Sequence, residues 1–225
     1  MTFTDIFKRA VASIADNQAL LLTALAWPFV AHLLISGYSG GGRMGLMMLL
    51  LSLFSVVVNA VIAITVHRIV LSGPDSVGKW GITSWGSAET SYLLHMIGLG
   101  LLMIPAALVA FIPLIGPLIA LALICWLISR LSLVFPAIAT GNKLSFQESW
   151  AQTEPHQLLM FLVVMVLPLL LILPALVLMF LPFKHLLFSI FSFIATVFVI
   201  AALSHAYKFI SADKRLEDDS AGMSA

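Results

Sequence analysis

Few side chains in the apolar stretches of this sequence could take part in chemistry. Intramembrane metalloproteases use His-Glu-x-x-His, and intramembrane aspartyl enzymes pair two carboxylates. Neither arrangement occurs within these stretches, because all ten Asp and Glu residues lie outside them. The polar groups inside or beside them, other than hydroxyls, are His32, Asn59, His67, His95, Arg130 and His205.

These polar groups are scattered in depth. His32 lies near the outer end of its apolar stretch, His95 near the inner end of its own, and Asn59 between those levels. A histidine near the end of a membrane helix is more often an interfacial group or a helix–helix hydrogen-bond partner than a metal ligand. We therefore predict no catalytic, metal-binding or cofactor-binding residue. His32, Asn59 and His95 are interpreted as intramembrane polar contacts, and Asn59 is expected to bond a neighbouring helix.

The composition is that of a membrane protein. Of the 225 residues, 61% are hydrophobic and 9% are charged, whereas about a quarter of residues are charged in soluble domains. The net charge is only +1, and the basic residues are scattered along the chain. Both features argue against nucleic acid as a partner. A single cysteine, Cys125, excludes an intramolecular disulfide.

The apolar stretches predict an all-α, polytopic membrane protein. A helix needs roughly 20 apolar residues to cross a bilayer, and the fourth run reaches that length only if it continues past Arg130 toward Pro136. We predict six transmembrane helices, arranged as three hairpins, in a domain over residues 18–208. The approximate runs are 18–36, 45–66, 91–111, 114–129, 157–181 and 186–207.

The loops alternate in character and indicate an orientation. Those at 37–44, 112–117 and 181–185 are short and poor in charge, whereas those at 67–90 and 140–156 are long and polar. The side with the long loops and both termini carries all but two of the eleven Lys and Arg residues, the exceptions being Arg43 and Lys184. By the positive-inside rule, both termini are expected to be cytoplasmic.

Short amphipathic helices are expected along the cytoplasmic surface. Residues 1–17 place Phe3 and Phe7 on one helical face and the charges elsewhere, as in an interfacial helix. A second such helix begins at the capping-box pattern of Ser145 and Glu148 and places Phe146 and Trp150 toward the acyl chains. The predicted interfacial anchors are Arg68, Arg130, Trp150, Phe3 and Phe7. Residues 209–225 read as a polar, disordered cytoplasmic tail.

A weak repeat runs through the sequence. TFTDIF (2–7) and SFQESW (145–150) share one pattern, and WGSAETSYLL (85–94) keeps its acidic and aromatic residues. Basic residues close the even-numbered spans in VHRIV, ISRLS and AYKFI. This similarity favours an interfacial helix followed by a hairpin, three times over.

The segment 130–153 resembles a known group of proteins. Arg130-Leu-Ser-Leu, Pro136-Ala137 and Ser149-Trp150 with Thr153 are similar to a pattern in uncharacterised bacterial six-helix membrane proteins, which are related to the membrane domain of some glycerophosphoryl diester phosphodiesterases. The chain departs from the family pattern at Glu154-Pro155-His156, where members carry a basic residue. The resemblance implies a six-helix inner-membrane protein and transfers no activity.

The sequence thus favours a non-enzymatic membrane protein that acts as a scaffold or in the lipid environment of the bacterial envelope. Its expected partners are membrane lipids, with another membrane protein left open. The alternative is a transporter or permease for an apolar or lipid-like molecule, because Pro105, Pro168 and Pro174 could kink helices around a cavity. Packing of kinked helices explains these prolines equally well.

Overall fold

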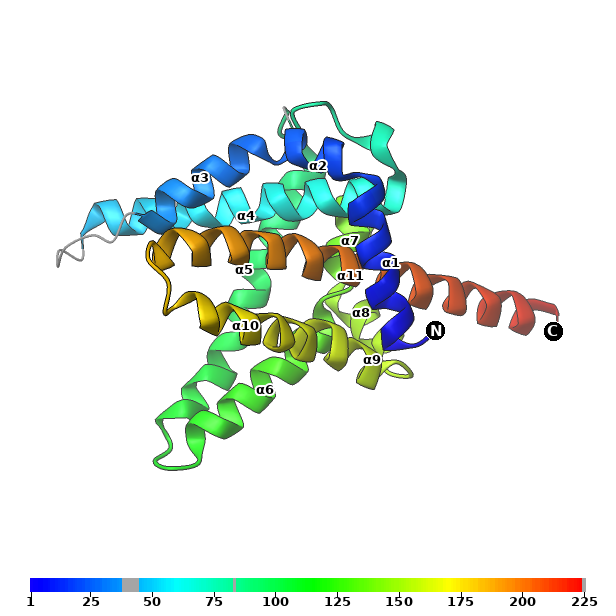
Figure 1. The fold of residues 1–225 in the computed structure, drawn as a ribbon. Coiled ribbons are helices and arrows are strands. Elements are labelled where there is room, and N and C mark those ends of the chain that lie inside the picture. The colour runs from blue at the N-terminus through cyan, green and yellow to red at the C-terminus, as the bar shows by residue number, and fades with distance from the viewer. Residues whose placement is uncertain (38–44, 83, 224–225) are drawn as a thin grey trace.

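The computed structural model describes residues 1–37, 45–82 and 84–223, and these fold into helices (Figure 1). The predicted loop positions Gly41 and Arg43 lie outside the described residues. Short 3-10 turns cover Pro74–Ser76 and Val109–Phe111, and a π-helical segment covers Leu162–Val166. The α-helices are α1 (Phe3–Asp16), α2 (Gln18–Ala24), α3 (Ala26–Gly37), α4 (Leu46–Ser72), α5 (Ser87–Leu108), α6 (Gly116–Leu131), α7 (Val134–Ala139), α8 (Phe146–Thr153), α9 (Gln157–Phe161), α10 (Leu167–Leu178) and α11 (Lys184–Met223).

Five helical stretches are long and apolar enough to cross a membrane, and they agree in position with five of the predicted runs. They are Leu46–Ser72, Ser87–Phe111, Gly116–Ala139, Gln157–Leu178 and Lys184–Leu216. The third of them continues past Arg130 and Pro136, as predicted, with a turn at Ser132 and Leu133 between α6 and α7. A sixth crossing would require α2 and α3 to act together, although they meet at an angle of 57°.

The break between α2 and α3 replaces the single straight helix that the sequence predicts for residues 18–36. Its cause is Pro28, which lies in the first turn of α3 and is buried. Proline has no N–H to donate to the carbonyl four residues earlier, which belongs to Ala24, the last residue of α2. The chain therefore turns at Leu25 and starts a new helix.

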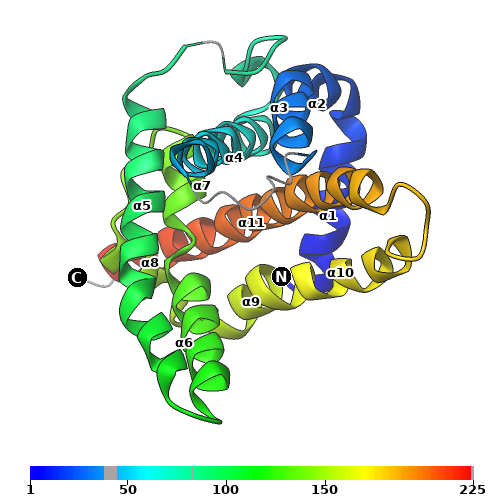
Figure 2. The ribbon, with the colours of Figure 1, turned by 90° about the vertical axis from the view of Figure 1, so that its left-hand side faces the viewer.

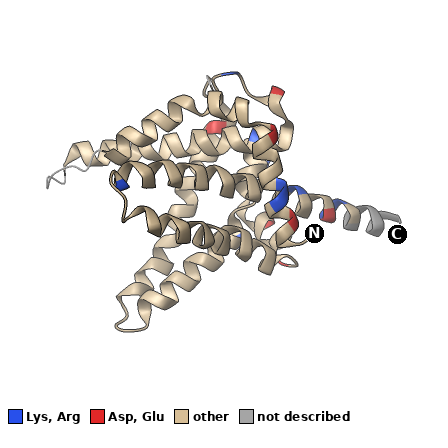
Figure 3. Cartoon of the chain, in the orientation of Figure 1, with Lys and Arg blue, Asp and Glu red and all other residues tan. Residues whose placement is uncertain are grey.

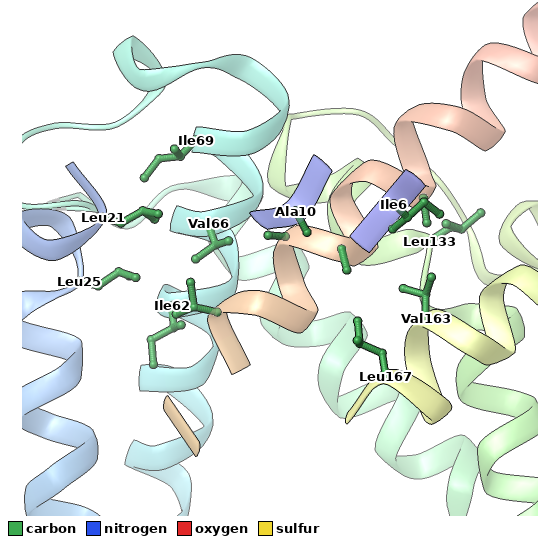
Figure 4. Packing of buried hydrophobic residues seen from close by; sticks show 14 of the residues in the cluster. Ile6, Ala10, Leu21, Leu25, Ile62, Val66, Ile69, Leu133, Val163 and Leu167 are labelled. Carbon is green, nitrogen blue, oxygen red and sulfur yellow. The ribbon is translucent and has the colours of Figure 1, made fainter. Parts of the chain in front are cut away.

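Neighbouring long helices pack as consecutive pairs, α3 with α4, α5 with α6, and α10 with α11. Figure 1 shows α3, α4, α10 and α11 running alongside one another, while the α5–α6 pair diverges from them. Figure 2, seen from one end, shows α11 between α4 on one side and α10 on the other. The largest core cluster gathers around α11 and includes Ile6, Ile62, Val66, Leu133 and Leu167 (Figure 4).

Three helices begin with the same hydrogen-bond arrangement. An acidic side chain in the first turn accepts the backbone N–H three residues earlier, at 2.8, 2.9 and 2.7 Å in chain order. Each of these helices packs on the helix of another hairpin, α1 on α11, α5 on α4 and α8 on α6. The repeated motif in the sequence is therefore a repeated helix cap. The pairs are Thr2–Asp5, Gly86–Glu89 and Ser145–Glu148.

One expectation needs correction. In the middle copy, the described residues before the span (67–82 and 84–86) contain no separate interfacial α-helix, because Glu89 lies in the first turn of α5 itself. From residue 209 the chain continues α11, which extends as one helix to Met223. This helix extends past the bundle at the end where α1 begins (Figure 1).

Candidate functional site

The three predicted intramembrane polar contacts lie on different helices and have different partners. His95 on α5 bonds the carbonyl of Ser91 through Nδ1 at 2.8 Å, and its ring packs on Phe146 of α8. His32 on α3 packs on Phe193, while its Nε2 is buried without a hydrogen-bond partner among the described residues. The contacts of these residues do not join them into one site.

The expected bond from Asn59 to a neighbouring helix is wrong. Its Nδ2 donates to the carbonyl of Ser55, one turn earlier in α4, at 2.8 Å, and also lies 3.3 Å from the Ser55 hydroxyl. Short polar side chains satisfy themselves on their own helix in this way when a carbonyl lies four residues back. Asn59 therefore contributes to α4 alone.

A buried ion pair joins α4 to α5. Nη1 of Arg68 lies 2.7 Å from Oε1 of Glu89, and Nε of Arg68 donates to the carbonyl of Ala139 on α7 at 2.8 Å. The Glu89 side chain is 6% exposed and the Arg68 side chain 22%. Arg68, predicted as an interfacial anchor, connects three helices through these contacts.

A second polar contact lies next to that pair. His67 is fully buried, and its Nδ1 shares a hydrogen bond of 2.8 Å with the hydroxyl of Ser204 on α11. Its ring also contacts Tyr92 of α5. This contact links α4 to α11, and burying a hydrogen-bonded imidazole there satisfies its polar atom while the helices pack.

The residues that carry the family resemblance converge on one helix end. The Ser149 hydroxyl donates to the main-chain carbonyl of Arg130 at 2.8 Å, and the Thr153 hydroxyl lies 3.1 Å from the same carbonyl and 2.8 Å from the Ser149 carbonyl of its own helix. Arg130 is one residue before the end of α6, where carbonyls lack partners within their own helix. The spacing of four residues places both hydroxyls on one face of α8. The motif therefore attaches α8 to the end of α6.

The Arg130 side chain is buried against an aromatic ring. It is 4% exposed, and its guanidinium carbon lies 4.6 Å from the centre of the Trp150 ring, which in turn packs edge-on against Trp126 at 4.8 Å. A cation over an indole face is a stabilising arrangement. Its Nε and Nη1 are buried without a hydrogen-bond partner in the described chain. Arg130 and Trp150, both predicted to face the membrane boundary, face each other.

No catalytic arrangement emerges from these contacts. Among residues 1–37, 45–82 and 84–223, no group of three His, Cys, Asp or Glu side chains is placed to hold a metal ion. The hydrogen bonds of Arg68, His67 and Ser149 join different helices, whereas those of Asn59 and His95 stay within one helix. Their geometry serves helix packing.

Helix α1 crosses α11 and packs on it. Ile6 and Ala10 are fully buried at the crossing, and Ser13 shares a hydrogen bond of 2.8 Å with Nε2 of His205. Phe7 packs edge-on against Phe198 with ring centres 5.1 Å apart. The predicted amphipathic helix 1–17 is thus fixed to the bundle by its apolar face, although Phe7 remains 39% exposed. Phe3, the other predicted anchor, packs at the edge of the same core.

An apolar groove lies on one side of this crossing. It has a volume of about 630 Å³ and runs between α1, the α2–α3 break and α11. Gln18 is the one polar side chain in its lining. The other lining residues are Val11, Ile14, Ala15, Leu21, Leu22, Leu25, Ala26, Phe29, Ile190, Phe193, Ile194, Val197 and Phe198.

A basic pocket lies on the other side of α1. Its volume is about 660 Å³, and its polar lining comes from Asp5, Lys8 and Arg9 of α1 and from His205 and Lys208 of α11. The two helices bring these residues together from opposite ends of the chain. Sequence reasoning identifies the basic pair on α1 but not the partner helix, because nothing local to residues 1–17 indicates contact with residues 205–212.

Comparisons with known proteins found no matching family model, and neither the curated proteins nor the solved structures gave a significant match. The resemblance of residues 130–153 to the membrane domain of some glycerophosphoryl diester phosphodiesterases stays a prediction. The structure gives those residues a packing role that does not depend on it.

Proposed function

We propose that this chain is a non-enzymatic, six-span protein of the bacterial inner membrane, with both termini cytoplasmic, that binds lipid. In this proposal the bent pair α2–α3 counts as one span and the spans form three hairpins. The orientation is supported by Figure 3, in which the charged residues gather mainly where the chain begins and α11 ends. Lys184, at the start of α11, lies at the opposite end.

The observation that carries the proposal is the apolar groove between α1, the α2–α3 break and α11. A volume of about 630 Å³ with one polar lining side chain suits an acyl chain rather than a polar metabolite. Two of its walls, α11 and the α2–α3 pair, are of membrane-spanning composition, and in this proposal the groove opens toward lipid. Leu22 and Ile194 line it and are 75% and 61% exposed.

A phospholipid with a photoactivatable group in its acyl chain tests this proposal. In proteoliposomes it should crosslink to α11 between Ile190 and Phe198, and Ala15→Trp, which fills the groove from α1, should reduce that crosslinking several-fold. Ala12→Trp is the matched control, because Ala12 is exposed on the same helix and does not line the groove. Equal crosslinking of both variants and the unmodified protein would contradict the proposal.

A lipid transporter is the second candidate, favoured by one observation. Leu25 and Ala26, at the 57° break between α2 and α3, line the groove, and substrate sites in transporters are commonly formed by discontinuous membrane helices. A fluorescent-lipid translocation assay in proteoliposomes separates the two functions. Transport predicts that the protein accelerates lipid movement between leaflets, whereas binding alone predicts crosslinking without movement.

A further inference from the structure

The basic pocket and the apolar groove lie on opposite sides of the same helix crossing. Lys8 and Arg9 face the pocket, whereas Val11 and Ile14, one turn further along α1, face the groove. On α11 the groove ends at Phe198 and the pocket begins at His205. Seven residues of α-helix correspond to about 10 Å.

This separation matches the structure of a bilayer. The headgroup layer extends roughly 5–8 Å beyond the hydrocarbon core on each side. If the groove lies at acyl-chain depth, a pocket about 10 Å further along α11 therefore lies near the level of the lipid phosphates. The depth of the pocket is therefore inferred from two features: the rise of α11 between Phe198 and His205, and the largely apolar residues 190–198 that line the groove.

The charges in the pocket favour an anion. Lys8, Arg9 and Lys208 contribute three positive charges against the single carboxylate of Asp5. That carboxylate already accepts the backbone N–H and the hydroxyl of Thr2, both at 2.8 Å. None of the three basic side chains forms an ion pair within the part of the chain whose side chains the structure describes.

We propose that Lys8, Arg9 and Lys208 bind the phosphate group of an anionic phospholipid in this pocket. The ligand chemistry is a phosphate ester, and the lipid source is favoured over a soluble phosphate because exposed apolar surface adjoins the basic residues. Phe7 and Val11, on the neighbouring face of α1, are 39% and 47% exposed. The proposal rests on the proposed lipid-binding function and adds a headgroup preference to it.

The test uses the full chain in detergent micelles with an equimolar mixture of phosphatidylglycerol and phosphatidylethanolamine of identical acyl chains, measured by native mass spectrometry. We expect a preference for phosphatidylglycerol. Because each basic side chain near an anionic lipid surface contributes on the order of fivefold in affinity, the double change Arg9→Gln with Lys208→Gln should reduce that preference by on the order of tenfold. The charge-preserving Lys208→Arg should retain it.

The matched control is Lys79→Gln with Lys143→Gln, which removes the same charge from exposed positions outside the pocket. An equal loss of preference in this control would attribute the effect to overall charge and overturn the proposal. An unchanged preference in the pocket variant would do the same. Displacement of phosphatidylglycerol by millimolar inorganic phosphate or glycerol 3-phosphate would reassign the pocket to a soluble phosphate.

These outcomes remain distinct from failure of the proposed function. If both lipids bind equally and acyl-chain crosslinking still maps to the groove, the chain binds lipid and the headgroup preference is wrong. If the unmodified chain retains neither lipid and no crosslink forms, the lipid-binding function itself is wrong.

Discussion

The Arg68 guanidinium and the Glu89 carboxylate lie 2.7 Å apart across the α4–α5 contact, on the two sides of the loop that separates these helices. We expect Arg68→Gln or Glu89→Gln to lower stability by about 3 kcal/mol, because each change leaves a largely buried charge without its partner. The double change Arg68→Met with Glu89→Leu should recover much of that loss. Thermal unfolding of the two single variants, the double variant and the unmodified protein in micelles measures these stability changes as a double-mutant cycle.

Lys79→Gln is the control for that cycle, since Lys79 is exposed in the same loop. Additive losses in the Arg68 and Glu89 single variants, with no coupling between them, would contradict the structural role of the pair.

The attachment of α8 to α6 depends on the Ser149 hydroxyl. Ser149→Ala should cost about 1 kcal/mol, because this hydroxyl donates a buried hydrogen bond to the Arg130 carbonyl. Thr153→Val should cost less, because the shortest hydrogen bond of the Thr153 hydroxyl is to the Ser149 carbonyl within α8. Hydrogen–deuterium exchange should show faster exchange confined to residues 146–153. Gln147→Ala, an exposed position on α8, should leave exchange unchanged. Protection that persists in the Ser149–Thr153 double variant would contradict this role.

The α8 cap should respond to acid. The backbone N–H of Ser145, and then its hydroxyl, hold the pKa of Glu148 below its ordinary value of 4.5. A lowered folded pKa means that the cap stabilises α8 above pH 4.5 and that this stabilisation is lost as the pH falls through the folded pKa. The amide resonance of Ser145 should titrate over that lower range, and Glu148→Gln should abolish the titration. A midpoint at or above 4.5 would contradict the prediction.

Chemical labelling tests the proposed orientation. In a Cys125→Ser background, a cysteine at Lys184 should react with a membrane-impermeant reagent from outside intact cells, whereas cysteines at Lys79 or Lys143 should not react. The reason is the distribution of basic residues between the two ends of the molecule (Figure 3). The opposite labelling pattern would reverse the orientation.

The predicted absence of a catalytic group is also testable. Replacing His32, His95 or Asn59 singly should impair growth or envelope integrity less than deletion of the whole chain, because each has separate local partners. Complete loss of function in an abundant His95→Ala protein would indicate a chemical role for that imidazole.

Hydrophobicity and local signals predict the helices well. Five spans are predicted near their observed positions, and the Ser145–Glu148 cap forms as its spacing predicts. The break at Leu25 is not predicted, although Pro28, the residue that signals it, lies only three positions away. A proline inside an apolar run is compatible both with a kink and with a continuous span, so the sequence alone does not decide between them.

The contacts between helices cannot be read in the same way. The hydrogen bond between His67 and Ser204 joins residues 137 positions apart, and that between Ser13 and His205 joins residues 192 apart. Hydropathy indicates that such residues lie in or near the membrane but not which helices they meet. For the same reason the sequence places Arg130 at the lipid boundary, whereas its ring partner is Trp150.

The π-helical segment Leu162–Val166 has a consequence for sequence change. Its wide turn is closed by the N–H of Leu167 donating to the carbonyl of Leu162. Each residue of an α-helix advances the direction of its side chains by about 100°, so an inserted residue rotates everything that follows. The wide turn takes five residues through about the angle that four residues cover in an α-helix, so rewinding it as regular α-helix without a deletion would rotate α10 by about 100°. Leu167 and Ala175, both 1% exposed, would then turn away from the core. The extra residue therefore sets the angular alignment between the two halves of this span.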